Sequence, residues 1–356
     1  MIYMNESRFL LKFNKFSSNG IFFDNERFFL LAKKNKVYSY DKLSKKFIKK
    51  GSVNISWFDK LFGYFRIYQR LRRLVFYNII PLGKNSFFLN FSNKIGYISE
   101  NGNFNLISGI VNKSKILNNG LATNKDYIFF GEYFPNNERK KTVNIYKFSK
   151  SNFRNEKVFT FPAGKVRHIH GIYKDPYSND FYVLTGDKAN ECGIYVTSDE
   201  FKTLKLMGGG DETWRAVSLV FTKDYFYYGT DAEFIPNKVY SISRDDFSRD
   251  EVGNLSGPVY YSALYKKIPL FFITAEMCPS QQDDFFKIVG IENGRLKTKY
   301  KCAKDFNFFK SFTKIFGMIF MPGTMHLPFH NDMNIENLYL YGIGLKDADD
   351  KVFKLN

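Results

Sequence analysis

Two histidines separated by a single residue are the most distinctive chemical group in this sequence. His168 and His170 stand in the tetrapeptide Arg-His-Ile-His at 167–170. On a β-strand, side chains two residues apart project to the same side, so both imidazoles are expected to face one surface. Imidazole takes up and releases protons near neutral pH, which makes His168 and His170 candidate catalytic residues.

Two arginines suggest what these histidines would act on. Arg167 precedes the histidines, and Arg215 occupies a similar position ahead of a later apolar segment. A guanidinium group binds a carboxylate through two parallel hydrogen bonds, so the two arginines could hold a uronate or another acidic sugar. A polysaccharide lyase needs such a cation, a base and a proton donor, and His170 and Tyr261 are the candidates for the last two roles.

Acidic residues at the ends of successive apolar segments form a second set of candidates: Glu132, Asp187, Asp231 and Glu276. A glycoside hydrolase uses two carboxylates, about 5–5.5 Å apart when it retains configuration and about 6.5–9.5 Å apart when it inverts it. Asp187 is the candidate catalytic residue of this set, and the other three are candidate substrate ligands. A structural role is equally open, in which each acid caps a strand end, the histidines bridge neighbouring units and the arginines pair with Asp187 and Asp231.

The histidines are also candidate ligands of a divalent metal. His168, His170 and Asp187 have suitable ligand types, and His326 and His330 are expected at the same face. These are all four histidines of the chain. No other cofactor is expected.

Apolar segments rich in aromatic residues recur through the chain and determine where these candidates lie. Seven units can be aligned, each with an apolar strand, a short polar turn and a second apolar strand; in four of them a small residue and an acid follow. Asp187, Asp231 and Glu276 are 44 and 45 residues apart, close to the length of a four-stranded propeller blade. We therefore predict an all-β fold, a seven-bladed β-propeller that forms a single domain over 1–356. A two-sheet sandwich with irregular strands is the alternative.

Propeller geometry would bring the candidates together. The first strand of each unit would line a central channel and the second would run back antiparallel. The start of the first strand and the end of the second then meet at one face of the ring. That face is the expected mouth of a binding pocket.

The segment 56–74 interrupts the β pattern. Its apolar residues recur at roughly helical spacing, among five basic residues: Lys60, Arg66, Arg70, Arg72 and Arg73. This pattern predicts a basic helical insertion between two blades. The insertion either lies on a membrane surface as an amphipathic helix or packs against the ring.

The overall charge favours an anionic partner. Lysine and arginine total 53 against 35 aspartates and glutamates, giving a net charge of +18. An acidic polysaccharide or an anionic membrane surface fits this charge. Nucleic-acid binding is not clearly indicated, because the basic residues are not concentrated in a patch with aromatics. The three cysteines are odd in number and far apart, and the N-terminal stretch lacks a signal-peptide core, so a reduced, cytoplasmic location is expected.

One short motif resembles a known family. The segment 197–204, Thr-Ser-Asp-Glu-Phe-Lys-Thr-Leu, resembles the Asp-box S-x-D-x-G-x-T-W of sialidase-type propellers. Asp199 and Thr203 match and Thr197 replaces serine, whereas Phe201 and Leu204 depart from the pattern. A longer block over about 70–345 is similar to sialidase-like BNR-repeat proteins of bacterial polysaccharide gene clusters, often described as glycosyl hydrolases. The arginine triad, Tyr–Glu pair and aspartic acid of true sialidases have no recognisable counterpart here.

This resemblance implies a sialidase-like propeller with a connection to carbohydrate. Together with the candidate residues, it leads us to expect a protein that binds and cleaves an anionic, uronate-containing polysaccharide, as a lyase or a glycoside hydrolase. The alternative is a non-catalytic propeller that serves as a scaffold in polysaccharide biosynthesis or assembly, with a membrane association through 56–74.

Overall fold

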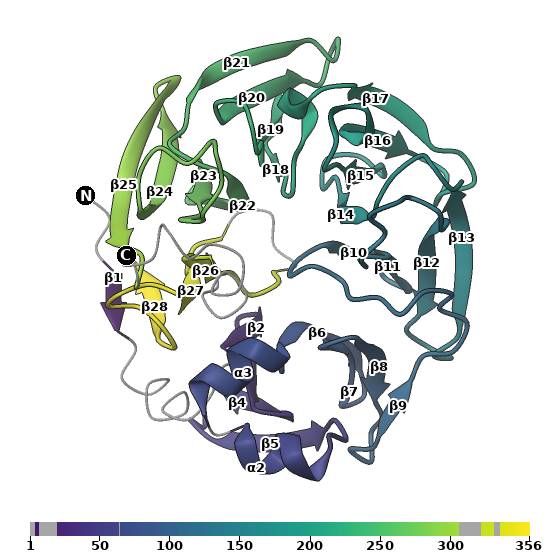
Figure 1. Ribbon diagram of the computed structural model, residues 1–356. Helices are drawn as coiled ribbons and strands as arrows, with labels where there is room; N and C mark the ends of the chain where they lie inside the picture. Colours follow the sequence, from purple (N-terminus) through teal and green to yellow (C-terminus); the bar gives the residue numbers. More distant parts are fainter. Residues whose placement is uncertain (1–3, 7–19, 64, 306–321, 331–334) are drawn as a thin grey trace.

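Seven antiparallel sheets of four strands each are arranged in a ring (Figure 1). This computed structural model describes residues 4–6, 20–63, 65–305, 322–330 and 335–356. The prediction of an all-β, seven-bladed β-propeller is confirmed. The sialidase-like subtype remains a prediction.

The first four blades follow one another along the chain. The first contains β2 (Ile21–Asp24), β3 (Phe28–Lys33), β4 (Lys36–Asp41) and β5 (Phe47–Ser52). The second contains β6 (Phe76–Gly83), β7 (Ser86–Phe91), β8 (Lys94–Ile98) and β9 (Phe104–Leu106). The third contains β10 (Leu121–Thr123), β11 (Tyr127–Gly131), β12 (Val143–Ser149) and β13 (Asn155–Phe161). The fourth contains β14 (Ile169–Lys174), β15 (Phe181–Thr185), β16 (Gly193–Thr197) and β17 (Lys205–Gly209).

The next two blades repeat this order, and short 3₁₀ turns accompany the fourth and fifth. The fifth blade contains β18 (Val220–Phe221), β19 (Tyr225–Gly229), β20 (Lys238–Ser243) and β21 (Arg249–Asn254). The sixth contains β22 (Val259–Tyr265), β23 (Ile268–Ile273), β24 (Phe285–Glu292) and β25 (Arg295–Ala303). The 3₁₀ turns are η1 (Ala189–Glu191) and η2 (Glu212–Trp214).

The seventh blade joins the two ends of the chain. It contains β26 (Thr324–His326), β27 (Tyr339–Ile343) and β28 (Val352–Leu355), and its outer strand is β1 (Met4–Glu6), which pairs antiparallel with β28. The backbone hydrogen bonds of β1 therefore close the ring. The stretch 310–324, which the repeat pattern assigned to the seventh unit, lies almost entirely outside the described residues, and the innermost strand begins at Thr324.

Tight turns and aromatic packing explain why these segments form hairpins. The turns Lys84-Asn85, Lys266-Lys267 and Asn293-Gly294 have positive φ at both positions, as type I′ turns require, and their twist matches that of the strands. Between the third and fourth blades, Phe129, Phe181 and Phe201 are buried with ring centroids 4.7, 5.4 and 5.6 Å apart. Aromatic pairs at this spacing stabilise the packing of one blade on the next.

The Asp-box-like segment forms the turn between β16 and β17. The Asp199 carboxylate accepts hydrogen bonds from Thr203 N at 2.9 Å, from the Thr203 hydroxyl at 2.7 Å and from the Thr197 hydroxyl at 2.8 Å. The hydrogen bonds from Thr203 and Thr197 lower the pKa of Asp199 to about 2. The residue therefore fixes the hairpin and lies outside the cavity described below.

Two short helices lie between the first and second blades, at the segment expected to be a helical insertion. They are α2 (Trp57–Phe62) and α3 (Arg66–Arg72), and Figure 1 shows them in front of β4 and β5. The Ser56 hydroxyl caps α2 by accepting a hydrogen bond from Asp59 N, and Arg73 ends α3 in a left-handed conformation. Within the described ranges, no helix combines the length and apolar character needed to cross a membrane.

Candidate functional site

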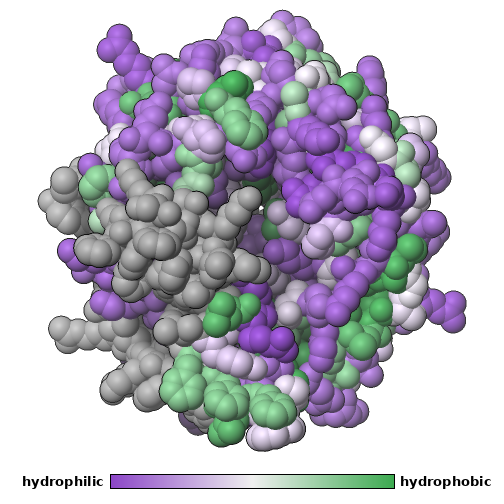
Figure 2. All heavy atoms as spheres, in the orientation of Figure 1, coloured by the Kyte–Doolittle hydropathy of each residue, from purple (hydrophilic) through white to green (hydrophobic). Residues whose placement is uncertain are grey.

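A cavity of about 340 Å³ lies at the face of the ring where the innermost strands begin. All seven blades contribute to its wall, through residues that include Ile21, Tyr77, Tyr133, His170, Asp231, Tyr260 and His326. We call it the axial cavity. Its size falls in the range of about 300–1,000 Å³ that is usual for small-molecule sites. Figure 2 shows one face of the ring, hollowed near its centre and bordered there by hydrophilic side chains.

A repeated irregularity of the innermost strands directs side chains into the axial cavity. In β2, β6, β14 and β22, the pairing with the second strand skips one residue near the start of the strand. The skipped residues are Phe22, Tyr77, His170 and Tyr260, and all four line the cavity. A β-bulge releases one residue from the ladder and re-aims its side chain. His170 therefore occupies a position that four blades use in the same way.

The two histidines of the fourth blade lie side by side, as their spacing predicts. Their ring centroids are 5.2 Å apart, and the His168 ring stacks on Tyr133 at 3.8 Å. His170 Nδ1 lies 3.0 Å from the carbonyl oxygen of Ala216, and His168 Nδ1 lies 3.4 Å from that of Phe134. Burial lowers the pKa of His168 to about 4, so this imidazole is neutral at neutral pH.

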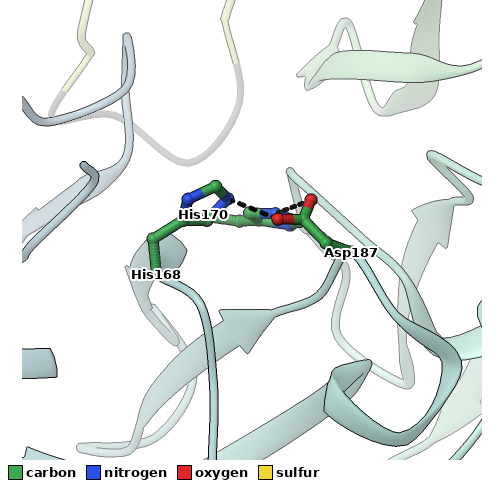
Figure 3. Close-up of side chains that lie close together, drawn as sticks. All are labelled: His168, His170 and Asp187. Atoms are coloured by element: carbon green, nitrogen blue, oxygen red, sulfur yellow. Dashed lines mark ion pairs between the residues drawn. The ribbon is translucent and has the colours of Figure 1, made fainter. Parts of the chain in front are cut away.

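Asp187 is the centre of the charged cluster. Its carboxylate lies 3.2 Å from His168 Nε2, 3.7 Å from His170 Nε2 and 2.9 Å from Arg167 Nη1. Figure 3 shows both imidazoles directed at this carboxylate. Burial opposes its ionisation, but the contacts with His168 and His170 outweigh burial and hold the pKa of Asp187 well below its usual range.

The backbone around Asp187 is unusual. Its φ is +102°, a conformation that side-chain-bearing residues rarely adopt and that costs about 1–3 kcal/mol. The preceding residue is Gly186, and a Cβ there would lie 2.7 Å from His170 Cε1. Glycine at 186 and the strained backbone of Asp187 therefore allow this carboxylate to lie against the His170 ring. Such strain is typical of functional sites.

Arg215 joins Asp187 to the fifth blade. Its Nη2 lies 3.4 Å from Asp187 Oδ1 and its Nε lies 3.2 Å from Asp231 Oδ2, while Glu233 is 3.6 Å from Nη1. Arg167 pairs with Asp187 and does not line the axial cavity. The two arginines therefore pair with Asp187 and Asp231, which is the structural alternative stated above for them.

The acids of the fifth and sixth blades differ from Asp187. Burial raises the pKa of Asp231 to about 7, against the pull of Arg215 and with a further contribution from Glu276. Burial also raises the pKa of Glu276, whose carboxylate accepts a hydrogen bond from the Tyr260 hydroxyl. Asp231 lines the axial cavity and Glu276 does not. The neutral form of Asp231 is thus accessible close to neutral pH.

Glu132 has a different role from the one expected. Its carboxylate, 1% exposed, accepts five hydrogen bonds, from the backbone and side-chain amides of Asn112 and Asn144 and from the Tyr146 hydroxyl. It does not line the axial cavity. We correct its assignment as a substrate ligand, because its acceptors are used to join strands and loops of the third blade.

Of the two histidines of the seventh blade, His326 lies at the expected face and His330 does not. His326 is on the innermost strand β26 and lines the axial cavity, and its ring centroid is 5.3 Å from that of Tyr261. His330 lines a second cavity of about 360 Å³, formed at the other ends of the innermost strands by residues such as Tyr173 and Phe221. The expectation that all four histidines share one face is therefore wrong. His326 and His330 also lie outside the cluster of His168, His170 and Asp187 within the described part of the chain.

Two basic residues of the axial cavity were missed at the sequence level. Lys115 comes from the loop between β9 and β10, and its ammonium lies 4.9 Å from the ring centroid of Tyr77 and 5.0 Å from that of Tyr133. Arg73 follows α3 and reaches the same cavity. Neither forms an ion pair with another residue in the described ranges. Only the basic character of 56–74 hinted at Arg73, and nothing in the repeat pattern marked Lys115.

Comparison with known proteins supports the fold alone. No family model and no curated protein matches the chain. An oligogalacturonate lyase from Vibrio parahaemolyticus matches with a TM-score of 0.55 at 9% identity, over 100% of this chain and 91% of that one. A chain of the mitotic checkpoint complex matches with a TM-score of 0.56 at 10% identity, over 99% of this chain and 91% of that one.

A third match is the extracellular domain of a proposed one-component system from B. thetaiotaomicron. Its TM-score is 0.55 at 12% identity, over 95% of this chain. The present chain spans only 38% of the length of that matched chain. Proteins with such different roles share the propeller architecture, so the chain is similar to a widespread fold and its function must be argued from the cavity.

Proposed function

We propose that the protein binds an acidic sugar in the axial cavity and cleaves the glycan there by β-elimination. The observation that carries this proposal is the pair of cations, Lys115 and Arg73, that line the cavity without an acidic partner among the described residues. Both side chains are half-buried, and a partly desolvated cation that lacks a counter-ion favours an anionic ligand. The earlier candidates Arg167 and Arg215 are already paired with carboxylates, so the sugar-binding role passes to these two residues.

The surroundings of Lys115 suit a sugar acid. Its Nζ lies 3.4 Å from the Tyr77 hydroxyl, between the rings of Tyr77 and Tyr133. Cation–π contacts hold the ammonium in place without neutralising it. Tyrosine rings also supply flat apolar surfaces with a polar end, which match the two characters of a pyranose ring.

His326 and Tyr261 are the proton-transfer residues of this proposal. Burial lowers the pKa of His326 to about 4, so its imidazole is neutral and able to accept a proton at neutral pH. Burial also raises the pKa of Tyr261 and keeps its hydroxyl protonated. His170, the base expected from the sequence, is less available because Nδ1 lies against Ala216 O and Nε2 lies against Asp187.

The elimination balances with these groups. His326 takes the proton from the carbon next to the sugar carboxylate, whose charge Lys115 and Arg73 offset. The electron pair forms a carbon–carbon double bond as the bond to the leaving glycosidic oxygen breaks. Tyr261 gives its proton to that oxygen, and exchange with water restores both side chains. The similarity in fold to an oligogalacturonate lyase means that a chain of similar fold and length is a lyase; at 9% identity it gives no support for any particular residue.

A glycoside hydrolase is the second candidate, and one observation favours it. Asp187 and Asp231 lie beside the same guanidinium of Arg215, yet the pKa of Asp187 is held low while that of Asp231 is raised to about 7. In a glycoside hydrolase, the carboxylate with the low pKa serves as nucleophile or base, here Asp187, and the one with the raised pKa serves as general acid, here Asp231.

An assay with a panel of uronate-containing polysaccharides tests both candidates. We expect growth of the ultraviolet absorbance of an unsaturated uronate, lost in His326→Gln and unchanged in His330→Gln, since His330 lines the other cavity. Lys115→Ala should weaken binding of the acidic glycan. Reducing ends without new absorbance would indicate a hydrolase, with Asp231→Asn as the inactive variant. Binding without any cleavage would overturn both and leave a glycan-binding scaffold.

A further inference from the structure

The side chains of His168, His170 and Asp187 converge in a way that the proposed elimination does not use. One potential ligand atom from each residue lies within 4.8 Å of the other two. His168 Nε2 is 3.2 Å from Asp187 Oδ2, and His170 Nε2 is 3.7 Å from Asp187 Oδ1. Figure 3 shows the two rings approaching the carboxylate.

The hydrogen-bond partners of the two rings account for each Nδ1 but do not explain why each Nε2 faces the Asp187 carboxylate. Nδ1 of each histidine faces a backbone carbonyl oxygen, Phe134 O for His168 and Ala216 O for His170, so each Nδ1 is the nitrogen suited to carry hydrogen. Each Nε2 faces the Asp187 carboxylate, so it either donates hydrogen to that carboxylate or, when Nδ1 carries the hydrogen, offers its lone pair to a cation held between the ring and the carboxylate. His168 is 2% exposed, and its Nε2 has no aligned hydrogen-bond partner within the described structure.

We propose that His168, His170 and Asp187 bind one first-row divalent transition-metal ion, such as Zn²⁺. Two imidazole nitrogens and one carboxylate oxygen are ligands that such ions prefer, whereas Ca²⁺ and Mg²⁺ prefer oxygen ligands alone. Zn²⁺ binds nitrogen at about 2.0–2.1 Å and oxygen at about 2.0–2.2 Å, which separates neighbouring ligand atoms by roughly 3–3.6 Å. The observed separations of 3.2 and 3.7 Å, which go to the two different oxygens of Asp187, are close to this range, and the ligand atoms, all within 4.8 Å of one another, would move closer together around an ion.

The neighbouring arginines are compatible with such a site. Each carboxylate oxygen has two lone pairs, so Asp187 can accept from Arg167 and Arg215 and still offer a lone pair to a metal. Metal-binding carboxylates are commonly held by outer partners of this kind. Asp231 and Glu233 contact Arg215 and offset its charge.

The position of this cluster connects it to the cavity. His170 and Asp187 line the axial cavity, and three protein ligands leave coordination positions open on an ion of this type. An open position would face the sugar carboxylate, so the ion would add to the charge that Lys115 and Arg73 supply. This last step rests on the proposed function, whereas the metal site itself does not.

Metal binding is tested on the full chain, prepared without a histidine tag and dialysed against chelator. Titration calorimetry with Zn²⁺ alone should give one equivalent per chain, and Mg²⁺ should give no binding. X-ray absorption at the zinc edge should show two imidazole ligands. Because these measurements need no substrate, they succeed or fail independently of the lyase assay.

Matched variants decide the assignment. We expect the double variant His168→Gln, His170→Gln to weaken Zn²⁺ binding at least 100-fold, and the double variant His326→Gln, His330→Gln to keep it. Circular dichroism checks that both variants fold. If the first variant does not fold, a rise in the thermal midpoint of the unaltered protein on adding Zn²⁺, but not Mg²⁺, is the supporting result. Stoichiometric binding that persists in a folded His168, His170 variant, or no Zn²⁺ binding by the unaltered protein, would overturn the proposal.

Discussion

Replacing Glu132 with glutamine tests whether this buried carboxylate holds the third blade together. Oε1 accepts from Asn112 N at 2.9 Å and from the Tyr146 hydroxyl at 3.0 Å. Oε2 accepts from Asn112 Nδ2 at 2.8 Å, Asn144 N at 3.0 Å and Asn144 Nδ2 at 2.9 Å. A glutamine can keep an oxygen at only one of these two sides.

The loss of stability in Glu132→Gln can be estimated from the more favourable of the two orientations of the glutamine amide. With the amide oxygen in place of Oε2, three hydrogen bonds remain but lose their charged acceptor, which weakens each by about 1 kcal/mol. The amide nitrogen then faces two donors. The Tyr146 hydroxyl can rotate and accept, whereas Asn112 N–H is left without a partner at a cost of about 1–3 kcal/mol. Burying a neutral amide costs less than burying a carboxylate, so we expect a net loss of about 3 kcal/mol.

Urea denaturation followed by circular dichroism measures this loss. Glu156→Gln is the matched control, because it is the same substitution in the same blade at an exposed side chain whose contact with Lys147 is 3.8 Å. Surface pairs of this kind contribute little, so the control should unfold with the unaltered protein. If Glu132→Gln were as stable as Glu156→Gln, or if it lost glycan binding at unchanged stability, the structural role given to Glu132 would be refuted.

Three further predictions concern the cavity, the insertion and the ring closure. If His326 is the base, kcat/KM of the elimination should fall as pH drops through about 4, where this imidazole becomes protonated; a pH profile checks this, and an acid limb that persisted in a residually active His326→Gln would argue against it. Exposed apolar residues on and beside α2, namely Trp57, Phe58, Leu61, Phe62 and Phe65, lie near Lys60 and Arg72, so we expect binding to anionic but not neutral vesicles, seen by co-sedimentation and a blue shift of Trp57 fluorescence. Phe58→Ala with Phe65→Ala should abolish it and Phe234→Ala, exposed elsewhere, should not; equal binding by both would rule out this surface. Deleting residues 1–6 removes β1 from β28 and should lower the urea midpoint, whereas an unchanged midpoint would show that β1 does not secure the ring.

The architecture was predictable because each blade repeats a simple pattern. Strands with alternating apolar residues and the turns between them are local features of the sequence, and the number of times they recur predicts the number of blades. The closure by β1 was not predictable, since three residues at one end of the chain carry no repeat signal. The placement of His330 failed for a related reason: the repeat pattern assigned 310–324 to the seventh unit, whereas the innermost strand of that blade is β26, and the residues after β26 reach the opposite face.

The site was only partly predictable. The sequence Arg-His-Ile-His correctly placed His168 beside His170, although His168 precedes β14 and His170 is the bulge residue, so regular strand alternation is not the reason. The acid after the second strand correctly placed Asp187 near them. Lys115 enters the cavity from a loop between blades, and such positions depend on long-range packing that no local pattern records. The pairing of Arg215 with Asp187 and Asp231 likewise depends on the contact between two blades.

The repeated bulge has a consequence for how such a cavity could change over time. Phe22, Tyr77, His170 and Tyr260 stand outside the regular ladder of their strands, so the identity of each side chain is largely uncoupled from strand pairing. An exchange at any one of them alters the chemistry of the wall while the sheet beneath keeps its register. New ligand preferences can therefore arise through single substitutions at the bulge positions of separate blades, without a change in the fold.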